Sequence, residues 1–500
     1  MRKIGLFLFF LLWYTCSVQA QDFDELFNAF VSQNQQQFDG FEDSINAKFA
    51  KAISTYMKTF VGEQPKVKDT KPKPRIQPEL KKEEPLMLPE ETEVPPTIQK
   101  SDLEPDVPET MPQEEPALPK PPSTSNPVVE QILSQESEPK DYPVEQYNYI
   151  DFNLFGENIQ WVEKSFPNKL TGITSDDVSE FWVQLSECDY EEMLQRCRET
   201  KQTQNFNDWA VFQLVLSMAQ QTYDLQYNEQ VVFTIFMLNQ LGMAAKVGFS
   251  SNHLFCLVAV AQQLYGIPYI DIANNRYYFF ELNPTYDFKS EGLSFRTYDL
   301  EFPKKTQSLD MNIRQPLRSV KTAISEDSVC VNANMIELFK TYPQVEIDVY
   351  ANAVPSEIFC HSIEQRFHTY IHTQSIYDDV SFLLSYMHSN FDYSTDTDQF
   401  GYEKPFFCEE NYYYPKNDCE DRSVLFSFLV RYLLHLDVVL VDYPGHIAVA
   451  VNFPMEVGGE SVQYNGKKYV ICDPTYNGAS IGMEMSGFSA ADRTIIPLYR

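Results

Sequence analysis

The feature that most constrains the fold of this chain is an internal repeat. Residues 232–238 align without a gap with residues 425–431, and the same register places His253 on His446. Each histidine opens an apolar segment, which is followed by a hairpin turn and then by a Pro-Thr-Tyr triplet. A helical run, a histidine, a strand and a hairpin that recur in one order predict two tandem copies of one unit of helices and strands.

Hydrophobic periodicity predicts the elements of each copy. In the first copy we expect a helix capped by Ser175, and then helices and strands at 189–198, 207–222, 228–241, 254–261, 269–272 and 277–282. In the second copy we expect helices at 355–373, 376–390 and 419–436, and strands at 447–453 and before Asp473.

The start of the chain predicts export. Residues 1–20 combine a short basic start, an apolar run and a small-residue cleavage site, which is typical of a secretory signal peptide. A lipid anchor on Cys16 is a weaker alternative, because the residues before it fit that signal poorly. No other run of about 18 apolar residues follows, so we expect a periplasmic or secreted protein without a transmembrane segment after cleavage.

Composition divides the rest of the chain into five parts. Residues 21–62 carry a Phe-rich stripe at helical spacing, which predicts an amphipathic helix that binds a protein partner or packs on the main body. Residues 63–145 are rich in Pro and Glu and predict a disordered linker. The first copy then spans 146–287, a connecting region expected to be strand-rich spans 288–354, and the second copy spans 355–500.

Charge and cysteine usage exclude other classes. A formal net charge of −32 argues against a nucleic-acid partner, because phosphate binding needs clustered Lys and Arg. Eight cysteines follow the signal peptide at wide spacings, which resemble neither a disulfide scaffold nor a zinc site. We therefore predict no metal and no cofactor, and the disulfide pairing stays open.

The second copy holds a candidate catalytic set of Cys419, His446 and Asp473. Asn417 or Asp418 is suited to cap a helix, which places Cys419 in its first turn, where unpaired N–H groups favour a thiolate. His446 opens one strand and Asp473 ends a later one, so antiparallel neighbours would bring the carboxylate to the imidazole. This is the order of a nucleophile, its base and the group that orients the base.

The first copy differs where this chemistry would lie. Cys419 falls opposite Gln226 and Asp473 opposite Asn283, so the first copy has no nucleophile. It keeps His253, however, which shows that such a histidine does not by itself indicate catalysis. In the second copy the oxyanion is expected to meet the Cys419 N–H and one side-chain donor among the tyrosines 412–414.

The segment Asp418-Cys419-Glu420-Asp421 before an apolar helix, followed by a histidine that opens a strand and an aspartate that closes another, resembles the transglutaminase-like superfamily of papain-like cysteine enzymes. The resemblance covers about residues 355–485, with a degenerate echo at 175–287. It implies an α+β fold with a cysteine helix packed on an antiparallel sheet, and amide acyl-transfer chemistry.

Two departures from the family's pattern leave the substrate type open. Ile447-Ala448 follow the histidine where the family often has an aromatic residue, and His435 stands where a glycine is common. The expected function is an exported thiol-dependent amide hydrolase or acyltransferase, including a cysteine peptidase, that acts on protein or peptide substrates. The alternative is a non-catalytic envelope or secreted binding protein on the same fold.

Overall fold

The computed structural model describes residues 66–67, 149–162, 165–250, 253–283, 296–297, 305–325, 328–372, 375–485 and 493–499. The expected signal peptide at 1–20 and amphipathic helix at 21–62 lie outside the described residues, as does the linker at 63–145 apart from residues 66–67. Within the described ranges, no helix has the length and apolar character needed to cross a membrane.

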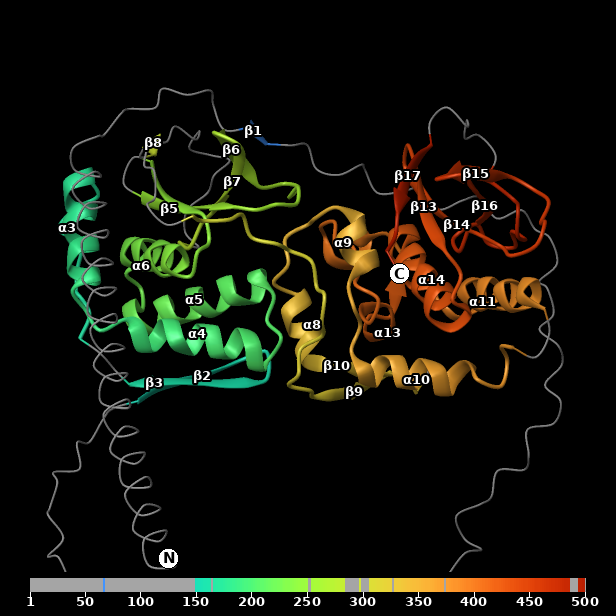
Figure 1. Ribbon diagram of the computed structural model, residues 1–500, viewed down its shortest axis with the longest axis horizontal. Helices are drawn as coiled ribbons and strands as arrows, with labels where there is room; N and C mark the ends of the chain where they lie inside the picture. Colours follow the sequence, from blue (N-terminus) through green and yellow to red (C-terminus); the bar gives the residue numbers. More distant parts are fainter. Residues whose placement is uncertain are drawn as a thin grey trace, which may run out of the picture. The chain divides into compact units, whose positions relative to one another are not determined.

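The described chain is a mixed α+β structure with antiparallel sheets, as the sequence predicts at this level (Figure 1). Its first half begins with the hairpin β2 (Tyr149–Leu154) and β3 (Glu157–Val162). Four helices follow: α3 (Ser175–Ser186), α4 (Glu191–Thr203), α5 (Asp208–Tyr223) and α6 (Tyr227–Gln240). The cap of α3 is Thr174 rather than Ser175, since the Thr174 hydroxyl and the Asp177 carboxylate form a reciprocal capping box.

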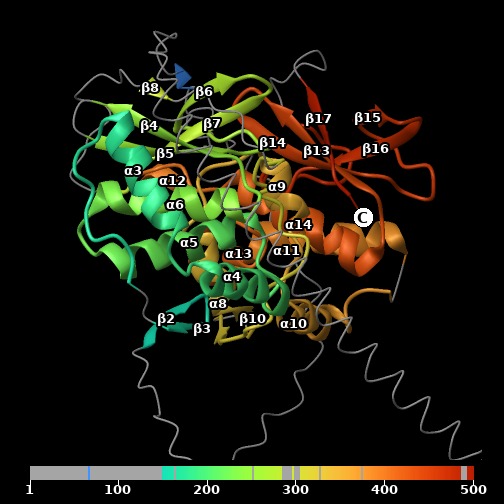
Figure 2. The same cartoon turned by 60° about the vertical axis from the view of Figure 1, so that its left-hand side comes forward.

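The sheet of the first half has the order β1-β6-β7-β5-β4-β8, and all its neighbours are antiparallel. Its strands are β4 (Ala245–Ser250), β5 (His253–Ala259), β6 (Pro268–Ile272), β7 (Asn275–Phe280) and the two-residue β1 (Lys66–Val67) and β8 (Arg296–Thr297). Helix α6 packs against β4 and β5, and Figure 2 shows α5 and α6 on the same side of these strands.

The connecting region differs from its expected strand-rich character. It holds the short strands β9 (Thr322–Ile324) and β10 (Cys330–Asn332), but two helices follow, α8 (Ala333–Phe339) and α9 (Ile347–Asn352). The prediction of strands is therefore wrong for these two segments. The Asn332 side chain accepts the N–H groups of Asn334 and Met335, which starts α8 by an N-cap that the sequence interpretation overlooked.

The second half combines helices with a second sheet. Its helices are α10 (Glu357–Phe367), α11 (Ile376–Asn390), α12 (Asp396–Phe400), α13 (Glu410–Tyr413) and α14 (Cys419–Leu434). The short parallel strands β11 (Asp392–Tyr393) and β12 (Lys416–Asn417) pair between them. The sheet strands are β13 (Val438–Tyr443), β14 (His446–Val451), β15 (Ser461–Tyr464), β16 (Lys467–Cys472) and β17 (Thr494–Pro497).

This second sheet is antiparallel in the order β15-β16-β14-β13-β17, which matches the order β6-β7-β5-β4-β8 of the first. Along β14, Ile447, Val449 and Val451 face the large core shared with α14, whereas Ala448 and Ala450 belong to a smaller cluster on the other face. The strand is buried on both faces, so its register is strongly specified.

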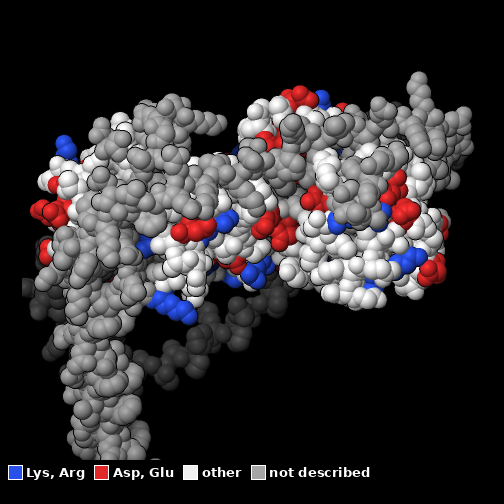
Figure 3. Space-filling model, turned by 90° about the horizontal axis from the view of Figure 1, so that it is seen from above, with Lys and Arg blue, Asp and Glu red and all other residues white. Residues whose placement is uncertain are grey.

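One large core contains buried residues from both halves, from Phe155 to Ile481. Surface charge is mixed in sign, since acidic and basic side chains are interspersed on the face seen from above (Figure 3). The shared core fixes α14 and the second sheet, on which the candidate site lies.

Candidate active site

Cys419 is the first residue of α14. The Asp418 carboxylate accepts the N–H groups of Glu420 at 2.9 Å and Asp421 at 3.4 Å, and the Asp421 carboxylate accepts the Asp418 N–H at 3.1 Å. This capping box makes Asp418, of the two expected residues, the N-cap. Cys419 therefore lies where the N–H groups of the first helical turn point away from the helix, although its side chain is buried.

His446 and Asp473 are in direct contact. His446 is the first residue of β14, and Asp473 directly follows β16, which pairs antiparallel with β14. His446 Nε2 lies 2.6 Å from Asp473 Oδ2, and both side chains are almost fully buried. The structure thus brings these two predicted residues together by the antiparallel pairing expected from the sequence.

Topology places Cys419 at the same end of the fold as His446. A three-residue connection turns α14 back into β13, and β13 pairs antiparallel with β14, so α14 and β14 run in the same direction. Ser423, one turn after Cys419, donates its hydroxyl to the carbonyl of Ile447 at 3.1 Å. Because Ile447 directly follows His446, the first turn of α14 lies against the start of β14.

The Asp473 carboxylate is held ionised. Burial by itself would raise its pKa, but the neighbouring His446 and the N–H groups of Thr475 and Tyr476 outweigh burial and lower the pKa. Because this carboxylate engages Nε2 of His446, Nδ1 is the ring nitrogen on the side away from Asp473. An ionised orienting group of this kind fixes both the tautomer and the direction of the ring.

His388 on α11 was not foreseen by the sequence interpretation. Its Nε2 lies 3.0 Å from the backbone carbonyl of Asp473. Burial lowers the pKa of His388, so the ring is neutral near pH 7 and Nε2 is the donor. The contact anchors the segment that carries Asp473. Its only sequence signal is the position of His388 in the last turn of a well-predicted helix.

A buried cation lies one turn from the thiol. Arg422 donates Nε to the Asn417 side-chain oxygen at 2.9 Å and Nη2 to the Phe391 carbonyl. Burial lowers the pKa of Arg422, but its electrostatic interactions with Tyr393 and Cys419 act in the opposite direction. A guanidinium in this position favours the thiolate form of Cys419. The sequence interpretation did not consider this arginine.

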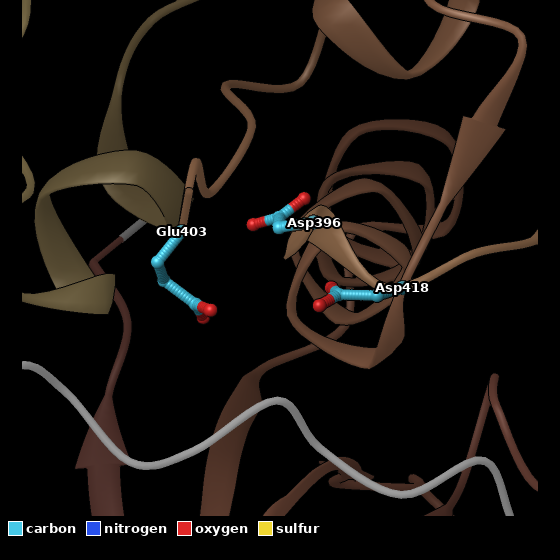
Figure 4. A group of neighbouring side chains, drawn as sticks. All are labelled: Asp396, Glu403 and Asp418. Atoms are coloured by element: carbon cyan, nitrogen blue, oxygen red, sulfur yellow. The ribbon is translucent and has the colours of Figure 1, made fainter. Parts of the chain in front are cut away.

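Carboxylates also gather at the start of α14. Oxygen atoms of Asp396, Glu403 and Asp418 lie within 4.8 Å of one another, and Figure 4 shows the three side chains converging from separate segments. Burial, and then the charge of Asp418, raises the pKa of Asp396 to about 9. The same causes raise the pKa of Asp421 well above its ordinary value.

Among the described residues, these three carboxylates have the geometry to hold a cation. The sequence did not indicate this group because its members are widely spaced along the chain. Protonation of the buried members relieves their mutual repulsion without a metal ion. Neutral Asp396 also reduces the negative charge near Cys419 at pH 7. The acidic residues therefore oppose the thiolate less than their number in the sequence indicates.

The tyrosines expected to hold an oxyanion make other contacts. The Tyr412 hydroxyl lies 3.1 Å from that of Tyr386. The Tyr413 side chain is 41% exposed, with Lys340 over its ring, and the Tyr414 ring packs against Phe406.

The three predicted side chains are enclosed. Cys419, His446 and Asp473 are each 1% exposed. Cavities of about 470 Å³ and 650 Å³ in the described part of the chain are lined by other residues, chiefly from the first half. In that half, Gln226 precedes α6 and makes no side-chain cap, and His253 opens β5. The helix start there has no thiol.

The sequence and the structure were compared with known proteins. No family model matches the chain, no curated protein matches it, and no solved structure matches it.

Proposed function

We propose that this protein is an exported thiol-dependent amide hydrolase or acyltransferase with a transglutaminase-like fold. The observation that carries the proposal is the buried pair of His446 and Asp473, with Nε2 and Oδ2 2.6 Å apart, at the end of the sheet where α14 begins with Cys419. A cysteine at a helix start, a histidine and an ionised carboxylate are the parts that nucleophilic amide chemistry needs.

The reaction follows from the position of each group. His446 takes the Cys419 proton, and the thiolate attacks the carbonyl carbon of a protein or peptide carboxamide, so that an S–C bond forms. The C–N bond then breaks as the imidazolium returns the proton to the leaving amine. Water or a second amine attacks the resulting thioester and restores the thiol, which gives hydrolysis or acyl transfer.

The proposal includes two tandem copies of one unit, of which only the second is active. The two sheets share one strand order, and the helix before each sheet packs on corresponding strands, α6 on β4 and β5 and α14 on β13 and β14. The strands β4 and β13 also correspond residue for residue in the register that aligns His253 with His446. Gln226 and Asn283 replace the nucleophile and the orienting acid in the first copy. Pro284, Thr285 and Tyr286, which extend the repeat, lie outside the described residues.

A non-catalytic binding protein on this fold is the second candidate. The observation that favours it is the enclosure of the triad, because Cys419 and His446 are each 1% exposed. Such a protein would present its surface to a partner, and its cysteine would be an ordinary core residue.

The two functions differ in their reaction with an activated ester. We expect p-nitrophenyl acetate to acetylate Cys419 in the full chain, with release of p-nitrophenolate and a mass increase at the Cys419 peptide. Cys419→Ala should abolish the rapid release, and Cys472→Ala, which removes another buried thiol, should keep it. Equal rates for wild type and Cys419→Ala would favour the non-catalytic protein.

A further inference from the structure

Asn411 is a buried amide close to the start of α14. It lies on α13, which packs against α14, and it is 2% exposed. Its Oδ1 accepts a hydrogen bond from Asn417 Nδ2 at 2.9 Å, and Asn417 Oδ1 accepts one from Arg422 Nε at 2.9 Å. The three side chains form a chain of hydrogen bonds around the first turn of α14.

This chain fixes the orientation of both amides. A guanidinium only donates, so the group of Asn417 that faces Arg422 must be its oxygen. The Asn417 amide nitrogen then faces Asn411, and the group of Asn411 that faces Asn417 must again be an oxygen. The NH₂ group of Asn411 therefore points away from Asn417, and exchanging its O and N atoms would break the network.

The Asn411 NH₂ group is not satisfied by hydrogen bonds within the described residues. Its Nδ2 is buried and has no hydrogen-bond partner among the described residues. A buried donor without an acceptor costs stability, so its retention in a fixed orientation calls for a ligand. The missing partner is an acceptor, and an oxygen with developing negative charge is the strongest acceptor that the proposed reaction forms there.

The neighbours of Asn411 bracket the nucleophile. Asn417 lies two residues before Cys419, and Arg422 lies three residues after it, on the next helical turn. The helix start supplies the Cys419 backbone N–H as one donor. Of the tyrosines expected to supply the second donor, Tyr412 meets the Tyr386 hydroxyl, Tyr413 is exposed beneath Lys340, and Tyr414 packs on Phe406. Asn411, which directly precedes Tyr412, offers a buried amide.

We infer that Asn411 is a catalytic residue whose Nδ2–H, with the Cys419 N–H, holds the oxyanion of the tetrahedral intermediate. This inference rests on the proposed function. When the thiolate bonds to the carbonyl carbon, the C=O π pair moves to oxygen, and Asn411 donates to that oxygen. When the C–N bond breaks, the pair returns to C=O and the amine leaves with the proton from His446.

Two reactions of Cys419 separate this role from a structural one. Acetylation by p-nitrophenyl acetate passes through an oxyanion. Alkylation by iodoacetamide is a displacement at a saturated carbon, so it forms no oxyanion and reports only the thiolate and its access. Both rates depend equally on the fraction of folded protein and on the fraction of thiolate. The acetylation rate divided by the alkylation rate is therefore independent of both.

The test compares full-length wild type with Asn411→Leu and Asn411→Asp. The aspartate variant keeps the oxygen that accepts the Asn417 hydrogen bond. It therefore provides the test if the leucine variant fails to fold. We expect the ratio of acetylation to alkylation to fall by about 100- to 1,000-fold in both variants, as for loss of one oxyanion donor. Asn452→Leu is the matched control, because Asn452 Nδ2 donates to the Lys468 carbonyl at the other end of β14.

The outcomes are distinct. An unchanged ratio in a folded Asn411 variant overturns the role of Asn411 and leaves the proposed function intact. If wild-type Cys419 is alkylated no faster than in His446→Ala and is not acetylated, both the inference and the proposed function fail.

Discussion

Asp473 combines two interactions at the scale of single residues. Its Oδ2 meets His446, and its Oδ1 accepts the N–H groups of Thr475 and Tyr476 at 2.9 and 3.0 Å. The backbone contacts hold the carboxylate in place, so the histidine is oriented by a rigid partner. The charge and the position of Asp473 can therefore be tested separately.

Replacing Asp473 with asparagine tests the charge. The amide keeps the shape and one acceptor but cannot stabilise an imidazolium, so we expect acetylation of Cys419 to fall by about 10²- to 10⁴-fold, the range for loss of general-base function. Asp437→Asn is the control, since it neutralises a carboxylate that pairs with Lys467 away from the candidate site. Equal rates in Asp473→Asn and wild type would refute the role of the carboxylate.

Asp396 gives a prediction for stability against pH. Burial and Asp418 raise its pKa to about 9, so the folded protein keeps a proton that the unfolded chain loses above about 3.8. A raised native pKa of a carboxyl group gives stability that is complete below the unfolded value and is lost as pH rises towards 9.

We therefore expect Asp396→Asn to flatten the fall in stability between pH 5 and pH 9, and to be more stable than wild type at the upper end. Urea unfolding at several pH values measures this. Asp398→Asn, on the same short helix α12, is the control. Parallel pH profiles for wild type and Asp396→Asn would contradict the account.

At the scale of elements, Ser423 joins α14 to β14. Its hydroxyl donates to Ile447, whereas the equally buried Ser427 donates to Val424 within its own helix. We expect Ser423→Ala to cost about 1 kcal/mol of unfolding free energy and to slow alkylation of Cys419. Ser427→Ala should leave the alkylation rate unchanged, and a similar slowing in both variants would show that the contact does not position the thiol.

The elements also show what could be predicted from sequence. The helix expected at 376–390 is observed as α11 (Ile376–Asn390), because Ser375 and Asp378 form a capping box before a clear apolar stripe. The start of α14 was predicted for the same reason. Helices α8 and α9 were missed because they are short. Their few apolar residues do not show a helical periodicity that distinguishes them from strands.

The environment of the candidate site could be predicted only in part. Cys419, His446 and Asp473 could be chosen as candidates because each lies at the boundary of a periodic element. Asp396 and Glu403 reach Asp418 only through the tertiary fold, and the amide of Asn411 depends on contacts with Asn417 and Arg422. Sequence spacing contains no signal for such contacts.

At the scale of the whole molecule, the shared core predicts cooperative unfolding. Buried residues of both halves belong to one cluster. The Glu409 carboxylate also joins the connecting region to the second half, since it accepts the N–H groups of Asn332 at 2.8 Å and Ser356 at 2.7 Å. A core that crosses both halves leaves neither with a complete core of its own. We therefore expect the two halves to unfold together.

The distribution of reporter residues allows a direct test. Trp161, Trp182 and Trp209 lie in the first half, and Trp13 lies outside the described residues. Tryptophan fluorescence thus follows the first half, and the accessibility of Cys472 to a thiol reagent follows the second. We expect coincident urea midpoints, and well-separated midpoints would show two independent folding units.

The central claim is that His446 activates Cys419. Burial raises the pKa of Cys197 and Cys360 to about 12 and also raises that of Cys188, so these thiols stay protonated near pH 7. None of the eight cysteines among the described residues is in a disulfide, and Cys188, Cys330 and Cys360 are the more exposed ones.

The most direct test is therefore the rate of iodoacetamide alkylation at each cysteine of the full chain, measured by mass spectrometry at pH 7. We expect Cys419 to react first despite its burial. We also expect His446→Ala to slow the alkylation of Cys419 by at least about tenfold, a smaller effect than the roughly 10²- to 10⁴-fold that is typical of a general base. Faster alkylation of the half-buried cysteines, with no effect of His446→Ala on Cys419, would contradict the central claim.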